Sequence, residues 1–433
     1  MSWKAEYIFL IIFSTSIDYF AALKIQKTEK KRQKKCFLYL SLIVNLGTLF
    51  AFKYFNFFSE NVSSFFQQIY LFNNSLAHQL LLPVGISFYT FQSMSYTIDV
   101  YRNKIKVEHS FVKFALYVSF FPQLVAGPIE RAGSLLPQFD KKYNFEYKRV
   151  TDGLKLMFWG FFQKLVIADN MARFVDIVYN NPENYYGWDI ILVTFFFAIQ
   201  IYADFSGYTD IARGAAKVMG YNLMINFKRP YFASSIKEFW QRWHISLSTW
   251  FKDYVYISLG GSQHGQFKWF YAIAITFILS GLWHGAKWTF ILWGAYHAIL
   301  YLSENLFLKK QKEIIKSYRI ILFLKIGLVF LATSFGWLIF RANSISDFVI
   351  LLDNLFSEKL FTPRISFDRP SMLVNFLSVL ILFIVWIIER EKSIVEFISE
   401  KPIYQRWTIY FVSALCLIGL GNWGMKPFIY FQF

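Results

Sequence analysis

Apolar runs of a length that spans a bilayer recur from one end of this chain to the other, and they constrain its fold more than any other feature. An α-helix needs roughly 20 consecutive apolar residues to cross the hydrocarbon core, and every backbone polar group there must be satisfied within the protein. The candidate spans are about 6–23, 36–53, 79–100, 150–168, 188–208, 268–284, 287–303, 318–340, 372–388 and 406–424. The sequence therefore predicts an all-α polytopic membrane protein.

The composition agrees with lipid as the main solvent. The 433 residues are 56% hydrophobic and only 17% charged, whereas soluble domains are usually roughly 25% charged. The formal net charge of +17 comes from Lys and Arg residues clustered between apolar runs, where they orient helices and meet anionic lipid. We therefore expect membrane lipid, and not nucleic acid, as the partner of these charges. The two cysteines, Cys36 and Cys416, lack metal-ligand spacing, so no metal site or disulfide is predicted.

Two apolar stretches are too irregular for simple spans. Residues 110–127 contain a Phe-Pro-Gln-Leu run near their end, and the aromatic stretch 239–259 holds His, Arg, Lys and Asp, so both are expected to be re-entrant or interfacial. The run 24–35, with seven basic residues and one acid, should stay in the cytoplasm. With both irregular stretches counted as re-entrant, the basic segments 102–106, 228–242, 309–319 and 389–406 also fall inside. The joint between spans 268–284 and 287–303 and the C-terminal tail then face outward.

His284 is the leading candidate for chemistry, because it lies between apolar spans, where an ionisable side chain is costly without a purpose. An imidazole titrates near neutral pH, so it can take the proton of an attacking hydroxyl and return one to a leaving thiol. The alternative is a helix-end histidine that hydrogen-bonds a carbonyl. His297, on the following span, is in position to face it but is interpreted as structural.

His244 is the second candidate, and it is predicted to share a helical face with Trp240 and Leu247. The alternative, a packing histidine on an aromatic face, is the commoner role for such a residue. Glu238 and Arg242 in the same stretch have the i,i+4 spacing of an ion pair.

A second charged group stands at the inner end of span 188–208. Asp204, Asp210 and Arg213 are interpreted as a buried bridge between helices, since Asp210 and Arg213 have i,i+3 spacing.

Tyr430 is the one hydroxyl in the C-terminal run KPFIYFQF, residues 426–433. A phenol has a pKa near 10, so its ester is a better leaving group than an alkyl ester and can act as a covalent relay. The alternative is an aromatic anchor at the membrane interface. The sequence has no GxSxG elbow, no HExxH pair and no Gly-rich nucleotide fingerprint, which argues against serine hydrolases, zinc proteases and nucleotide-driven pumps.

At this point the sequence resembles the membrane-bound O-acyltransferase superfamily, in particular its bacterial branch that O-acetylates alginate, peptidoglycan and related polymers. The likeness covers nearly the whole chain. Its motifs are LLPVGISFYTFQSMSYTIDVYR (81–102), FFPQLVAGPIER (120–131), QIYADFSGYTDIARG (200–214), FKRPYFASSIKEFWQRWHISLSTWFKDYVYISLGG (227–261) and GLWHGAKWTFILWGAYHA (281–298). The resemblance implies that His284 is the residue essential for acyl transfer, that His244 is the second invariant histidine, and that Tyr430 belongs to an aromatic-Tyr motif proposed as an acyl relay.

The resemblance also implies a fold and a reaction. It implies a ring of slanted transmembrane helices with re-entrant segments around a thin central tunnel, in a single membrane domain over residues 1–433. Relatives usually carry roughly 40 further residues at the N-terminus, so about two helices of the usual length are expected to be missing. The implied enzyme lies in the bacterial inner membrane and passes acetyl from cytoplasmic acetyl-CoA to an extracytoplasmic glycan. A secreted or membrane-tethered SGNH-type acetyltransferase is expected as the partner that completes the transfer.

Three alternatives stay open from the sequence. The donor is either acetyl-CoA or an acyl group on a carrier protein's phosphopantetheine. A transporter or flippase would also place polar residues along a path through the membrane, although repeated halves with broken helices, typical of transporters, are not evident. A scaffold subunit of a polysaccharide-export complex is the third interpretation. Release of thiol from acetyl-CoA distinguishes the enzyme from the transporter, whereas export restored by a catalytically dead His284 variant would favour the scaffold.

Overall fold

A computed structural model of the chain describes residues 6–68, 83, 85–124, 127–263, 265–308, 319–357, 364–365, 369–424 and 427–429, with the side chains of 65–68 and 307–308 excluded. Every regular element in these residues is a helix, which confirms the predicted all-α class. Each predicted span coincides with helical structure over most of its described residues. Six of the described helices are long and apolar enough to cross a membrane. The described part of the chain therefore folds as a multi-pass membrane protein.

The chain forms two compact units, which are described separately. The first unit comprises residues Met1–Glu146 and Met219–Met224, and the second comprises Tyr147–Val218 and Ile225–Phe433. The predicted single domain over residues 1–433 stays a prediction, as does the central tunnel. His244 and His284, the two candidate site residues that the structure describes, belong to the second unit.

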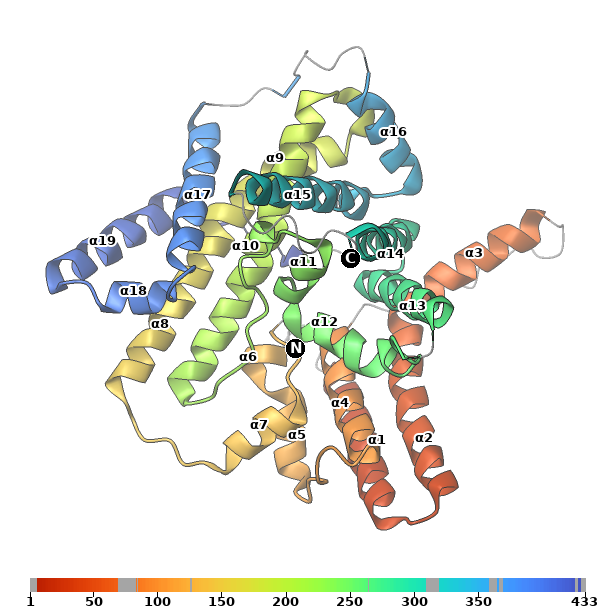
Figure 1. Ribbon diagram of the computed structural model, residues 1–433. Helices are drawn as coiled ribbons and strands as arrows, with labels where there is room; N and C mark the ends of the chain where they lie inside the picture. The colour runs from red at the N-terminus through yellow and green to blue at the C-terminus, as the bar shows by residue number, and fades with distance from the viewer. Residues whose placement is uncertain are drawn as a thin grey trace. The chain divides into compact units, whose positions relative to one another are not determined.

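In the first unit three long helices pack side by side (Figure 1). Its helices are α1 (Tyr7–Lys27), α2 (Lys31–Leu49), the π-helix η1 (Phe50–Tyr54), α3 (Phe55–Gln68), α4 (Ile86–Tyr101), α5 (Phe111–Ser119), α6 (Phe121–Leu124), α7 (Ala132–Leu135) and the 3-10 helix η2 (Leu136–Asp140). The buried carboxyl group of Asp18 on α1 accepts hydrogen bonds from Ser41 and Asn45 on α2 and so connects the two helices. The helix is interrupted at Phe120, between α5 and α6, within the stretch predicted to be irregular. Its re-entrant or interfacial position stays a prediction.

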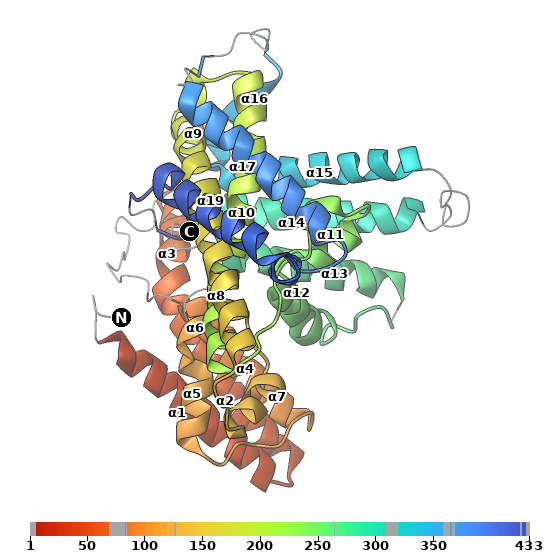
Figure 2. The same cartoon turned by 90° about the vertical axis from the view of Figure 1, so that its left-hand side faces the viewer.

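In the second unit the helices are α8 (Tyr147–Phe162), α9 (Asp169–Tyr179), α10 (Trp188–Met219), α11 (Ile236–Arg242), α12 (Ile245–Phe251), α13 (Gln266–His284), α14 (Trp288–Leu308), α15 (Arg319–Arg341), α16 (Ile345–Leu355), α17 (Arg369–Ile388), α18 (Ile394–Ser399) and α19 (Ile403–Leu420). Short elements between them are η3 (Gln163–Ala168) and η6 (Lys252–Tyr256), both π-helices, and η4 (Pro182–Asn184) and η5 (Pro230–Phe232), both 3-10 helices. Figure 2 shows α14 and α15 running side by side, as do α13 and α14.

The axis of the second unit is α10, whose 32 residues extend about 48 Å at the usual rise per residue. Its middle is almost entirely buried by protein, since α8, α17 and the α11–α12 segment surround it. The close approach of α8 depends on two glycine pairs, in which Gly160 lies against Gly207 and Gly153 against Gly214. A Cβ at any of these four positions would come within 3 Å of the facing backbone.

Charged residues inside this unit form bridges, as the sequence predicted. Lys164 of η3 contacts Asp204 of α10 at 2.7 Å and Asp169 of α9 at 2.8 Å. Arg213 contacts Asp210 at 2.9 Å, which confirms the i,i+3 pair. Lys164, which two carboxylates share, therefore joins η3, α9 and α10.

Candidate active site

His244 lies at a break between two short helices. The continuous helical face predicted for it is wrong, because α11 ends at Arg242, α12 begins at Ile245, and His244 adopts the left-handed conformation (φ 42°). This conformation costs a non-glycine residue roughly 1 kcal/mol or more, and such strain clusters at functional sites. Trp240 and Leu247 nevertheless line the same cavity as His244. The ion pair predicted between Glu238 and Arg242 is present.

Asn226 holds the break in place from the neighbouring segment. Its carbonyl accepts from the N–H of Ile245 at 3.0 Å, and its side-chain oxygen accepts from the N–H of Ser246 at 3.2 Å. The N–H of Lys228 donates to the carbonyl of Arg242 at 3.0 Å on the other side of the break. Segment 226–228 therefore runs along residues 242–246 like a paired strand and fixes the backbone of His244.

His284 is the last residue of α13, which packs closely against α14. At Gly281 an added Cβ would lie 2.1 Å from the carbonyl oxygen of Phe290, and at Gly285 it would lie 2.3 Å from the Phe290 ring. Glycine at these positions permits the tight helix hairpin. The hairpin orients the His284 imidazole toward the interior, where it is only 4% exposed.

The two histidines line one cavity of about 500 Å³, which we call the histidine cavity. Its walls come from α11, α12, η6, α13 and Tyr301 of α14, all within the second unit. His244 is 1% exposed, whereas Lys237, Gln241 and Lys252 in the same lining are exposed. The cavity thus leads from a surface that carries two lysines to two buried imidazoles.

Aromatic rings enclose both imidazoles and set their positions. The His244 ring meets Phe205 edge-on at 4.5 Å between centroids, and the His284 ring meets Trp293 and Phe340 edge-on at 5.2 and 5.3 Å. His297 lies on the far side of Trp293, at 4.9 Å from that ring, and is fully buried. It does not line the histidine cavity, so the structure favours the packing role predicted for it.

A smaller polar cavity of about 250 Å³ lies behind the Phe340 ring, which contacts His284. It is lined by Asp176 and Asn180 at the end of α9, by Lys287 between α13 and α14, and by Phe290, Phe340, Arg341, Ala342 and Asn343. Arg341 pairs with Asp176 at 2.9 Å and donates to Asn343 at 3.1 Å. No sequence pattern indicates this cavity, because its polar residues are scattered over three helix ends.

The C-terminal tail returns to the middle of the second unit. The Phe428 ring packs on Phe205 at 5.6 Å and on Tyr208 at 4.8 Å. Since Phe205 also contacts His244, a single ring separates the tail from the histidine cavity. Tyr430, the predicted relay, lies outside the described residues.

No cluster of three or more His, Cys, Asp or Glu side chains close enough to hold a metal ion is found in the described part of the chain. The histidine cavity combines imidazoles with hydroxyls and lysines. Such a set suits proton transfer.

Comparisons with known proteins show which family the chain belongs to. The model of the membrane-bound O-acyltransferase family, MBOAT, matches residues 33–342. Over 82% of its length the chain is 38% identical to the probable alginate O-acetylase AlgI of Pseudomonas aeruginosa, of which it covers 67%. It is 33% identical over its full length to the protein of the same name from Pseudomonas putida, covering 91% of it.

A third relative is a peptidoglycan O-acetyltransferase from Helicobacter pylori, with 37% identity over 69% of the chain and 60% of that protein. The chain thus spans about two thirds of the length of several of the curated relatives that it matches. The architecture and the matches define a membrane-embedded acyl-transfer enzyme. The chain belongs to the membrane-bound O-acyltransferase family, which confirms the resemblance drawn from its motifs.

Proposed function

We propose that this enzyme transfers acetyl from acetyl-CoA on the cytoplasmic side of the bacterial inner membrane to a hydroxyl of an extracytoplasmic glycan. The names of the relatives, alginate O-acetylase and peptidoglycan O-acetyltransferase, support acetyl as the group and a polysaccharide as the acceptor. The basic segments 228–242 and 389–406 support a cytoplasmic face near the donor.

The observation that carries the proposal is the histidine cavity. Exposed Lys237 and Lys252 line the same space as buried His244 and His284, so an anionic donor held at the surface can extend its thioester toward the imidazoles. Cationic side chains favour the phosphates of such a donor. The aromatic walls exclude water, which would otherwise hydrolyse the thioester.

In the proposed step, His284 removes the proton of an attacking hydroxyl. The oxygen bonds to the thioester carbonyl carbon, the C–S bond breaks, and the thiolate takes the proton from the imidazolium, which leaves an ester and a free thiol. His244, whose ring lines the same cavity and whose backbone is fixed by Asn226, positions the donor. A general base contributes typically 10²–10⁴-fold to such a step.

The polar cavity behind Phe340 supports an acceptor route from the opposite side. Sugars are recognised by hydrogen bonds to groups such as Asp176, Asn180 and Asn343, all of which line it or pair across it. Two residues of this cavity, Asp176 and Asn180, lie at the C-terminal end of α9, shortly before α10 begins. The basic segment 228–242 comes after the C-terminal end of α10. Since α10 is long enough to span the membrane, the two ends suit two sides.

Tyr430 is proposed as a covalent relay within this route. Its phenol oxygen would first accept acetyl from the thioester, with His284 taking the proton. A hydroxyl of the partner would then attack the aryl ester, and the departing phenolate would take the proton of that hydroxyl. The packing of Phe428 on Phe205, next to His244, supports delivery of the tail to the site. An SGNH-type partner outside the membrane is proposed to complete the transfer to the sugar.

A carrier-protein thioester is the second candidate donor. Among the relatives is a teichoic acid D-alanyltransferase from Bacillus subtilis, 29% identical over 61% of the chain, so this architecture also serves an acyl group other than acetyl. Both donors present a phosphopantetheine thioester, and the exposed lysines suit either.

The test is thiol release from acetyl-CoA by purified protein in lipid nanodiscs. We expect His284→Ala to lower the rate by at least 10²-fold, while His109→Ala, an exposed histidine in the first unit, leaves it unchanged. Intact-protein mass spectrometry should show an added acetyl group that Tyr430→Phe abolishes and that Tyr404→Phe, at an exposed tyrosine, retains. Undiminished thiol release by folded His284→Ala would remove that residue from its role. Lack of release by the wild type, with glycan still translocated, would favour the transporter alternative.

A further inference from the structure

A third cavity of about 340 Å³ lies in the second unit, and the proposed transfer route does not use it. Its wall carries four basic residues, Arg213, Lys217, Lys228 and Arg229, together with the acids Asp210 and Glu389. We call it the basic cavity. It lies between the C-terminal half of α10, the segment before η5, and the corner between α17 and α18.

The positive charge of the basic cavity is not fully neutralised. Arg213 pairs with Asp210 at 2.9 Å, and Lys217 approaches Asp152 at 3.7 Å. Lys228 and Arg229 form no ion pair with any residue that the structure describes. Two unneutralised cations side by side on a cavity wall favour binding of an anion.

The surroundings of Arg229 strengthen this excess of positive charge. Arg242 and Arg390 both repel its guanidinium, and Glu389 is the acid that attracts it. Burial and nearby Asp210 raise the pKa of Glu389 to about 7, so that its carboxyl is substantially protonated at neutral pH. Arg229 is also held in the left-handed conformation (φ 47°), a strained geometry for a residue with a side chain.

The remainder of the wall is apolar or carries hydroxyls. Val385, Ile394 and Val395 form a buried cluster against Leu156 and Trp159, and all five line the cavity. Hydroxyls of Ser206, Thr209 and Ser393 are also in the lining. Cations and hydroxyls beside an aliphatic wall match a phosphate ester attached to an apolar or amphipathic molecule.

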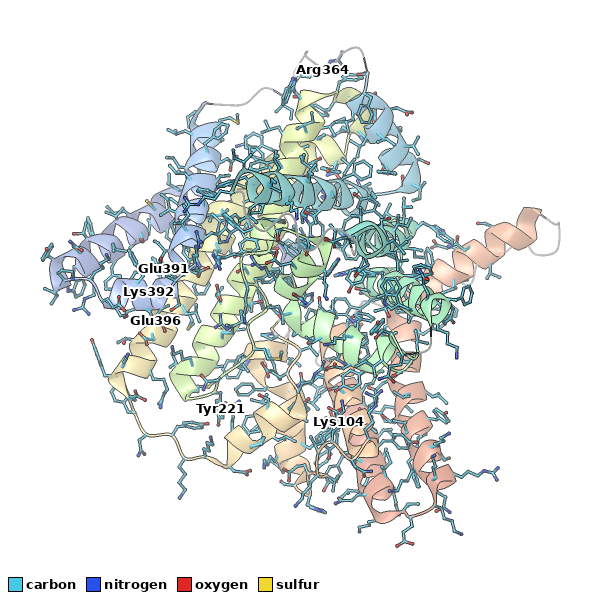
Figure 3. The ribbon with its side chains drawn as sticks, viewed as in Figure 1. Lys104, Tyr221, Arg364, Glu391, Lys392 and Glu396 are labelled. Carbon is cyan, nitrogen blue, oxygen red and sulfur yellow. The ribbon has the colours of Figure 1, made fainter. Side chains whose placement is uncertain are left out.

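The charged residues at the rim do not cancel this match. Figure 3 labels Glu391, Lys392 and Glu396 at the α17–α18 corner. Lys392 pairs with Glu400, and the Glu396 carboxylate accepts the N–H of Ser393 in a capping box. None of these three side chains lines the cavity.

We propose that the basic cavity is a phosphate-binding site, separate from the histidine cavity, and that Lys228 and Arg229 bind the phosphate of an amphipathic ligand. Two sources have this chemistry, namely the headgroup of an anionic phospholipid and the phosphates of a CoA-type donor. The aliphatic wall favours the phospholipid. Only the CoA-type donor depends on the proposed function.

The site also bears on the catalytic segment. Lys228 donates its N–H to the carbonyl of Arg242, and Arg242 donates from its guanidinium to the carbonyl of Arg229 at 3.4 Å. Residues 226 and 228 pair with the two sides of the break that holds His244. A bound phosphate would therefore stabilise the segment that fixes His244.

The experiment measures ligand binding and needs no activity. Lys228→Gln/Arg229→Gln is compared with the charge-matched Lys392→Gln/Lys401→Gln, whose residues do not line the cavity. Native mass spectrometry reports retained phosphatidylglycerol. Thermal unfolding in detergent with added CoA, or with pantetheine as a phosphate-free probe, reports the donor. The unfolding temperature without ligand shows whether each variant is folded.

A lipid source predicts that the wild type and the control retain phosphatidylglycerol, while the cavity variant binds it at least about tenfold more weakly. A donor source predicts that CoA, but not pantetheine, stabilises the wild type, and that this effect is lost in the cavity variant with lipid retention unchanged. A folded cavity variant that binds both phosphatidylglycerol and CoA like the wild type would overturn the proposal. Loss of thiol release with both bindings intact would instead concern the proposed function alone.

Discussion

The backbone N–H of Ile429 donates a 2.7 Å hydrogen bond to Oδ2 of Asp204, at the middle of α10. The other carboxylate oxygen of Asp204 contacts Lys164 at 2.7 Å, and both Asp204 and Ile429 are buried. One carboxylate thus joins η3, α10 and the C-terminal tail. The neighbouring Phe428 packs on Phe205, the ring that meets His244 edge-on.

Asp204→Asn should release the tail and destabilise the second unit. The substitution leaves Lys164 with Asp169 alone, and breaking a buried pair costs typically about 3–5 kcal/mol. We expect faster removal of the C-terminal residues by carboxypeptidase and a lower unfolding temperature in detergent. Asp140→Asn, at a carboxylate 64% exposed, should change neither. Unchanged protease resistance in Asp204→Asn would mean that the tail is held by Phe428 packing instead.

Asn226→Ala should impair chemistry more than folding. The variant loses the hydrogen bond to the Ser246 N–H and loosens the left-handed His244, at a stability cost of about 1–3 kcal/mol. Since Asn226 positions a residue of the site without lining the histidine cavity, kcat should fall at least about tenfold with a smaller change in the KM for the donor. Asn184→Ala, at an exposed asparagine, is the control. Equal kinetics in the two variants would contradict the positioning role.

Gly281→Ala should separate the α13–α14 hairpin and displace His284. The new methyl group would overlap the Phe290 carbonyl, which is backbone and cannot rotate away, so we expect a destabilisation of at least about 1–3 kcal/mol and a loss of thiol release. Gly327→Ala on α15 is the matched control, because an added Cβ there meets nothing within 4 Å. Alanine is the better helix former, so this control should be neutral or stabilised by up to about 1 kcal/mol. A hairpin that tolerated Gly281→Ala as well as Gly327→Ala would contradict the close packing.

Stability should depend on pH through Glu389. Its pKa is raised from 4.5 to about 7, mainly by burial, so the folded state binds a proton that the unfolded state has already lost between these values. Stability therefore falls as pH rises from about 4.5 to about 7, by at most about 3 kcal/mol, and changes no further above that range. Arg229 and Arg213 oppose this shift and Asp210 adds to it.

Glu389→Gln should flatten this part of the pH profile and raise the unfolding temperature relative to the wild type at pH 8, measured by thermal unfolding in detergent. Glu400→Gln, at an exposed carboxylate of the same corner, should keep the wild-type slope. If the stability of Glu389→Gln still fell over this pH range, the pH dependence would come from another titratable group.

The local elements of this protein were predictable, because lipid leaves a chain few choices. A run of about 20 apolar residues satisfies its backbone only as a helix, so α1, α10, α13 and α17 follow from composition and length. The ion pairs at i,i+3 and i,i+4 followed from helical spacing, as with Arg213 and Asp210. The motifs also singled out His244 and His284 before any contact was known.

The tertiary structure alone decided what these residues meet. Periodicity gave His244 a continuous helix, but pairing with Asn226, eighteen residues earlier, breaks that helix and turns its backbone left-handed. The joining of Lys164, Asp204 and Ile429, the polar cavity behind Phe340 and the basic cavity around Arg229 all combine residues distant in the chain. A sequence determines periodicity and burial cost locally, whereas such sites arise only when helix packing brings separate segments within a few ångströms.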